Sequence, residues 1–229
     1  MQILLLNMGS IDKEHYSLLD TCILENRYRY HVSSGRHRKQ TIFAGDLLLR
    51  FALMREKCDV TNVKICYGIN GKPYIENQEI YFNLSHSKNF VVLGIDKKEL
   101  GIDILCERKI NQNFIRFFYS KEEQRHLNYL VEEEKREYYW NALCYKEAYI
   151  KKSGGRIIDM KNRLICPRNI EYGKVIRVIE KGEEFESLFF KELTYHMCLI
   201  SDKIPKEVKV ETLNMDDIYN ELNSIFSVI

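Results

Sequence analysis

Apolar residues in the first hundred positions are grouped in patterns that predict several strands and one long helix. Residues 1–8 are mostly apolar and predict a buried first strand. Apolar side chains in 39–57 recur every three or four residues, which is typical of an amphipathic helix. Residues 80–84 and 90–95 are rich in β-branched and aromatic residues, so they predict two strands joined by a polar turn.

The second half shows helical patterns first and strand patterns later. A Ser-x-x-Glu capping box beginning at Ser120 predicts the start of a helix, and a longer helix is expected over 133–152, before a pair of glycines. Residues 185–201 predict a closing β-hairpin. The pattern therefore predicts an α+β protein of two halves of similar size, residues 1–100 and 101–229.

Composition narrows the class of protein. The 229 residues are 45% hydrophobic and 30% charged, an ordinary globular balance, and the net charge of +2 argues against a nucleic-acid-binding protein. Seven cysteines without a CxxC pair predict reduced thiols, and no run approaches the roughly 20 apolar residues that cross a bilayer. We therefore expect a cytoplasmic protein without a membrane partner.

The segment 27–39 contains four arginines and further basic residues but no acid. A local basic patch on a nearly neutral protein suits a small polyanion, although a solvated basic face would give the same pattern. Two polar motifs could add contacts to a phosphate. Lys72 stands in the stiff turn Gly71-Lys72-Pro73, and Ser85 and His86 offer several donors at the end of a predicted strand. Each motif alone is also typical of a surface turn.

Three charged residues could form a metal and phosphate site. Asp103 is flanked by β-branched residues in a predicted strand, where a carboxylate is costly to bury unless a cation meets it. Glu147 and Lys151 are one helical turn apart and so face the same way. The alternatives are an outward-facing aspartate at a strand end and an ordinary surface ion pair.

Taken together and in this order, GKP, FNLSHS, GIDI and KEAYIK resemble the signature of the Sfp-type 4'-phosphopantetheinyl transferases. The resemblance extends over about 36–155. It implies two similar α+β halves packed as an intramolecular pseudo-dimer, with the cofactor cleft between them. It also implies transfer of the 4'-phosphopantetheine group from coenzyme A to a serine of an apo acyl or peptidyl carrier protein, with Mg2+ required and adenosine 3',5'-bisphosphate released.

The resemblance also implies a role for each matching residue. Asp103 and Glu147 would hold Mg2+, and Lys151 would neutralise charge on the pyrophosphate and assist the leaving group. Glu147 is also the candidate base for the serine proton. Lys72, Ser85 and His86 would contact the nucleotide end with its 3'-phosphate. Arg38 is the candidate arginine from the 36–38 stretch that joins them.

One departure from the family pattern concerns the metal site. The family commonly has a third acid two residues after the aspartate, where this chain has Leu105. Water or Glu107 could take that place, and we expect weaker Mg2+ binding but not inactivity. The exposed apolar face for the carrier is expected at 117–119, and a monomer is the simplest expectation. The alternatives are a non-catalytic coenzyme A-binding relative and an unrelated Mg2+-dependent phosphoesterase.

Overall fold

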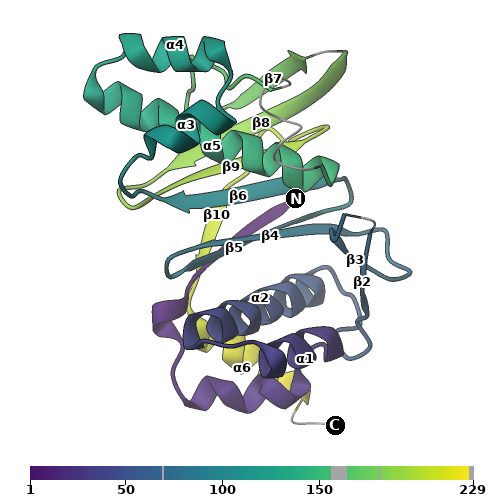
Figure 1. The fold of residues 1–229 in the computed structure, drawn as a ribbon. Helices are drawn as coiled ribbons and strands as arrows, with labels where there is room; N and C mark the ends of the chain where they lie inside the picture. The colour runs from purple at the N-terminus through teal and green to yellow at the C-terminus, as the bar shows by residue number, and fades with distance from the viewer. Residues whose placement is uncertain (69, 156–163, 181, 227–229) are drawn as a thin grey trace. The chain divides into compact units, whose positions relative to one another are not determined.

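The computed structural model describes residues 1–68, 70–155, 164–180 and 182–226. Helices and strands are both abundant in these ranges, which confirms the predicted α+β class (Figure 1). The chain divides into two compact units. Unit 1 contains Met1–Lys97 and the segment from Lys209 onward, and unit 2 contains Lys98–Val208. The pseudo-dimer stays a prediction. In the part of the chain that the structure describes, no helix combines the length and the apolar character needed to cross a membrane.

Unit 1 is built on a four-stranded sheet in the order β10-β1-β5-β4. Its strands are β1 (Gln2–Asn7), β4 (Tyr81–Ser87), β5 (Phe90–Asp96) and β10 (Val210–Leu213). β1 is antiparallel to β5 and parallel to β10, and β4 is antiparallel to β5. The predicted strands over 1–8, 80–84 and 90–95 are therefore confirmed.

The helices of unit 1 are α1 (Leu24–Val32), α2 (Arg36–Arg55) and α6 (Met215–Phe226), together with the 3-10 helices η1 (Met8–Ser10) and η2 (Glu14–Thr21). α2 confirms the helix predicted over 39–57. Its apolar residues Leu47, Leu48 and Phe51 are fully buried in one core cluster with Leu4 and Leu6 of β1. The apolar stripe read from the sequence is thus the face of α2 that forms the core.

A small hairpin of β2 (Ile65–Tyr67) and β3 (Pro73–Ile75) carries the Gly-Lys-Pro turn. The amide of Gly68 donates to the carbonyl of Lys72 over 2.9 Å, which closes the loop. Gly71 has φ +77, a left-handed conformation that favours glycine. The turn expected around Lys72 is therefore confirmed as the connection of a β-hairpin.

The division of the chain differs from the predicted one at its C-terminal end. The prediction assigned 101–229 to one half, but the segment from Lys209 onward belongs to unit 1. The reason is backbone pairing, because β10 adds to the sheet beside β1 with Ile3 opposite Val210 and Leu6 opposite Leu213. A pairing between residues some two hundred positions apart leaves no local trace in the sequence.

Unit 2 has a four-stranded antiparallel sheet in the order β6-β9-β8-β7. Its strands are β6 (Leu100–Cys106), β7 (Val175–Glu180), β8 (Glu183–Lys191) and β9 (Tyr195–Ser201), and its helices are α3 (Gln112–Phe118), α4 (Lys121–Tyr129) and α5 (Glu132–Ser153). α5 ends at Ser153, one residue beyond the predicted position, and its C-cap is Gly154 with φ +65. β8 and β9 confirm the predicted closing hairpin. The edge strand β7 was not predicted.

Candidate active site

Three of the predicted site residues come together in unit 2. Asp103 lies on β6 and is 4% exposed, while Glu147 and Lys151 lie one turn apart on α5. Lys151 Nζ donates to Asp103 Oδ1 over 2.7 Å. Burial and the nearby charge of Asp103 raise the pKa of Glu147 to about 6, although Lys151 opposes the shift. Two carboxylates and one ammonium therefore form a single electrostatic cluster, as the sequence predicted.

Gly101 allows this cluster to form because it lets α5 approach β6 closely. A Cβ atom at position 101 would lie 2.0 Å from the carbonyl oxygen of Ala148 and 2.4 Å from the amide nitrogen of Lys152. Any side chain there would collide with the backbone of α5. Side chains two residues apart on a strand share one face, so Asp103 points to the same side as this contact. The Gly-x-Asp spacing thus brings the aspartate to the helix that carries Glu147.

The two carboxylates fit a Mg2+ ion by the chemistry of their donors. Mg2+ binds one or two carboxylates and fills its remaining positions with water and phosphate oxygens. A cation would also offset the repulsion between Asp103 and Glu147 that raises the Glu147 pKa. Position 105 supplies no side-chain oxygen, because it is a leucine. Leu105 is half-buried and packs against the core of unit 2.

Glu107 was the other candidate for the missing third acid. Its Oε1 lies 2.7 Å from His196 Nε2, and its Oε2 forms an ion pair with Arg136. His196 itself is 1% exposed, and its Nδ1 lies 2.8 Å from Asn141 Oδ1. Both carboxylate oxygens of Glu107 thus belong to another network, which favours water over Glu107 at the third position.

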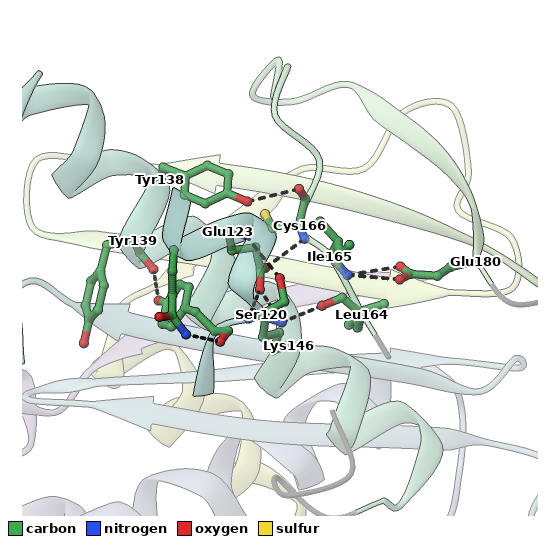
Figure 2. Close-up of polar contacts among 11 residues, drawn as sticks. Ser120, Glu123, Tyr138, Tyr139, Lys146, Leu164, Ile165, Cys166 and Glu180 are labelled. Atoms are coloured by element: carbon green, nitrogen blue, oxygen red, sulfur yellow. Dashed lines mark hydrogen bonds and ion pairs between the residues drawn. The ribbon is translucent and has the colours of Figure 1, made fainter. Parts of the chain in front are cut away.

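Lys146, directly before Glu147, has a structural environment that the sequence did not reveal. Figure 2 shows its ammonium inside unit 2, where Nζ lies 2.9 Å from Glu123 Oε2 and also donates to the carbonyl of Leu164. Lys146 and Glu123 are both fully buried. The other Glu123 oxygen accepts from the amide of Cys166 over 3.2 Å. Lys146 therefore joins α5 to α4 and to the segment that begins at Leu164.

The same close-up shows the predicted capping box of α4. The amide of Glu123 donates to Ser120 Oγ over 3.2 Å, and the amide of Ser120 donates to Glu123 Oε2 over 2.8 Å (Figure 2). The capping prediction is confirmed. Glu123 is also the ion-pair partner of Lys146. The capping residue therefore supplies the negative charge that neutralises this buried ammonium.

The predicted nucleotide-contacting residues lie in unit 1, around a groove of about 560 Å³. Arg38, from the first turn of α2, and Ser85 and His86, from β4, line this groove. Lys72 is not among the lining residues, although Gly71 and Pro73 on either side of it are. The structure therefore brings three of these four predicted residues together and the turn of the fourth beside them.

The groove is basic. Arg29 of α1 and His37 of α2 line it in addition to Arg38 and His86, and Asp46 is the acid among the lining residues. Arg29 Nη1 donates to Tyr67 OH over 3.3 Å, and His37 Nε2 lies 2.7 Å from the carbonyl oxygen of Lys88. Sequence reasoning placed Arg29 in the basic segment 27–39 but did not assign it to a site. Such a set of side chains suits a phosphate group.

The predicted docking face at 117–119 is wrong for two of its three residues. Phe118 and Tyr119 are 1% and 0% exposed and belong to the core of unit 2, and Tyr119 OH donates to the carbonyl of Tyr139 over 2.6 Å. Only Phe117 is exposed. In an aromatic run at a helix end, the sequence did not distinguish the side that faces the core from the side that faces solvent.

Comparisons with known proteins point to one family. Residues 99–198 match the model of the 4'-phosphopantetheinyl transferase superfamily. The 4'-phosphopantetheinyl transferase Sfp of Bacillus subtilis is 29% identical over 128 residues, 55% of this chain and 56% of that protein. The 4'-phosphopantetheinyl transferase psf-1 of Bacillus pumilus is 26% identical over 216 residues, 87% of this chain and 84% of that protein. A putative 4'-phosphopantetheinyl transferase of Haemophilus influenzae is 30% identical over 155 residues, 64% and 65% of the two chains.

These matches confirm the predicted resemblance. The chain nevertheless spans only a little more than half the length of the Bacillus subtilis relative. The matched segment 99–198 contains β6 and α5, and with them Asp103, Glu147 and Lys151. The segment that matches the family model therefore contains the acidic cluster.

Proposed function

We propose that this protein transfers the 4'-phosphopantetheine group of coenzyme A to a serine of an apo carrier protein, because residues 99–198 match the model of the 4'-phosphopantetheinyl transferase superfamily. The observation that carries the proposal is the cluster of Asp103, Glu147 and Lys151 in unit 2. It combines ligands for a divalent cation, a base and a phosphate-neutralising ammonium. The proposed partners are coenzyme A and an acyl or peptidyl carrier domain.

In the proposed reaction the serine hydroxyl oxygen of the carrier attacks the β-phosphorus of coenzyme A. The bond from that phosphorus to the oxygen that bridges the two phosphates breaks, and adenosine 3',5'-bisphosphate leaves with that oxygen. Such a reaction depends mainly on positioning and on charge neutralisation, because the protein forms no covalent bond. Mg2+ held by Asp103 and Glu147 would supply much of this neutralisation.

Each residue of the cluster then has a distinct task. Glu147 accepts the serine proton, directly or through water. Lys151 donates a hydrogen bond to Asp103, and its ammonium would stabilise negative charge on the leaving group. We assign the 3'-phosphate of coenzyme A to the basic groove of unit 1, with Arg38, Ser85 and His86 as contacts.

The test is the mass of a carrier protein. The purified protein is incubated with coenzyme A, Mg2+ and a panel of apo carrier domains, and each carrier is measured by intact mass spectrometry. The expected result is a gain of one phosphopantetheine on the carrier serine, absent with EDTA and in Glu147→Ala. Glu133→Gln, an exposed position on the same helix, is the matched control and should retain the gain.

One observation favours a second candidate, a coenzyme A-binding relative without transfer. Leu105 packs against the core in the place where the family commonly has a third acid. Coenzyme A binding by calorimetry, without a mass gain on any carrier, would favour this candidate over the transferase. If the protein showed neither coenzyme A binding nor transfer, both candidates would be refuted. That result would point to the third alternative, an unrelated Mg2+-dependent phosphoesterase.

A further inference from the structure

Unit 1 contains a buried ion pair that the proposed reaction does not use. Asp46 and Arg50 lie one turn apart on α2 and are 1% and 0% exposed, and Arg50 Nε donates to Asp46 Oδ2 over 2.7 Å. Burying two charges requires removing their hydration, so such a pair is poor evidence for a role in stability alone. Its other contacts indicate what it does.

The second oxygen of Asp46 reaches a different helix. Asp46 Oδ1 accepts from the amide of Ile23 over 3.1 Å and from Asn26 Nδ2 over 2.9 Å. Ile23 is the N-cap of α1, and it has no side-chain oxygen to bind the free amides of the first turn. Asp46 therefore gives this helix end an acceptor and a negative charge from α2. Arg50 adds a hydrogen bond of 3.1 Å to Thr21 Oγ1, just before α1.

α1 depends on such a connection because little of it is buried. It has nine residues, too few for a stable isolated helix, and Asn26 is its one buried side chain. Its apolar residues Leu24, Tyr28 and Val32 are 61–67% exposed and contribute little to its attachment, which leaves Tyr30 as the apolar residue of α1 that packs, partly buried, against the core. Arg29, which lines the basic groove, is also on this helix.

We propose that Asp46, supported by Arg50, is a positioning residue for the basic groove: it fixes the start of α1 on α2 so that Arg29 reaches the anionic group in the groove. The inference rests on the proposed function, because that anionic group is taken to be the 3'-phosphate of coenzyme A. Asp46 acts through α1 and not by contact with the ligand.

The sign of the mutational effect separates this role from a simple charge effect. Asp46 also lines the groove, so its carboxylate repels a bound phosphate. If charge alone mattered, Asp46→Asn would bind the 3'-phosphate more tightly. If Asp46 positions α1, the same substitution weakens the contact with Arg29 and binding of the 3'-phosphate becomes weaker.

The experiment compares the dissociation constants of coenzyme A and 3'-dephospho-coenzyme A by calorimetry. The dissociation constant of 3'-dephospho-coenzyme A divided by that of coenzyme A reports recognition of the 3'-phosphate. This ratio does not depend on how much of the protein is folded. We expect Asp46→Asn to reduce this ratio about tenfold, the size of one lost charge-assisted hydrogen bond. Leu222→Ala is the matched control: it removes a buried side chain of α6 in the same core and should leave the ratio unchanged.

Asp46→Asn leaves Arg50 buried without its ion-pair partner and could prevent folding. The second variant, Asp46→Leu with Arg50→Met, removes both charges and keeps apolar volume, so unit 1 should fold while the connection to Ile23 and Asn26 is lost. It should show the same loss of discrimination. An unchanged or increased ratio in a folded variant would overturn the inference. So would failure of both variants to fold, because the pair would then serve folding alone.

The outcome for the proposed function is separate. A wild-type protein that discriminates between the two ligands but modifies no carrier would refute the transfer reaction and leave the positioning role intact. A wild-type protein that modifies carriers but binds coenzyme A and 3'-dephospho-coenzyme A equally well would refute the assignment of the 3'-phosphate to the groove. The inference would then fail as well.

Discussion

Replacing Glu147 by glutamine should stabilise the metal-free protein at neutral pH while it abolishes transfer. Glu147 is half-buried beside Asp103, and burial and the negative charge of Asp103 raise its pKa from an ordinary value of 4.5 to about 6. The folded protein therefore holds the ionised form of this side chain at a cost. Glutamine has the same shape without the charge.

The pKa shift fixes both the sign and the size of the effect. Between about pH 4.5 and 6 the folded state retains a proton on Glu147 that the unfolded state has lost, so stability falls as the pH rises through this range. A difference of about 1.5 between the two pKa values corresponds to about 2 kcal/mol. The penalty is complete above the folded pKa and absent below the unfolded one. Glu147→Gln should therefore be about 2 kcal/mol more stable than the wild type near pH 8 and equally stable near pH 4.

The assay is urea unfolding followed by the fluorescence of Trp140, the single tryptophan, which is 1% exposed in the core of unit 2. Curves for the wild type and the variant are compared near the two pH values. Mg2+ should stabilise the wild type and narrow the difference, because it offsets the same repulsion. Glu133→Gln, on an exposed part of α5, should change stability by no more than about 0.5 kcal/mol. An equal or lower stability of Glu147→Gln near pH 8 would refute the reasoning.

Three further predictions test the packing around this site. Lys146→Met leaves Glu123 buried without its ion-pair partner and should cost about 3–5 kcal/mol in urea unfolding; adding Glu123→Gln should recover most of the loss, and no recovery would contradict the pairing. Gly101→Ala should cost about 3 kcal/mol and weaken Mg2+ binding in calorimetry, because its Cβ collides with the backbone of α5. Leu105→Glu adds a carboxylate on the same strand face as Asp103, so it should tighten Mg2+ binding; unchanged affinity would show that position 105 lies outside the metal site.

Much of the fold could be predicted because the signals were local. The long helix α5 was expected over 133–152 and extends over Glu132–Ser153, since its end depends on a glycine and its core face on helical periodicity. The capping box at Ser120 is equally local. The acidic cluster was also predictable, because the strand and helix periods decide that Asp103, Glu147 and Lys151 each point to one face of their element.

Other features depend on contacts between distant segments. α1 was not predicted, because its apolar residues Leu24, Tyr28 and Val32, four positions apart, form a stripe that faces solvent and does not mark a core face. Its attachment comes from Tyr30, which packs against the core, and from Asp46, some twenty residues later on α2. The role of Arg29 in the groove follows from that attachment and could not be read from the basic segment alone.

Neighbouring charged residues on α5 therefore have different roles in this protein, and only their surroundings distinguish these roles. Lys146 and Glu147 are neighbours on α5, but a helix turns by about 100° per residue, so the two side chains leave it in different directions. Lys146 enters the interior and meets Glu123 and a carbonyl oxygen, so its charge is matched within the protein. Glu147 lies beside a second carboxylate, and burial together with the charge of Asp103 raises its pKa, although Lys151 opposes the shift. Two carboxylates share one ammonium here, so a cation would be most stabilising at this pair, and this is why we assign the metal to Asp103 and Glu147 and a structural role to Lys146.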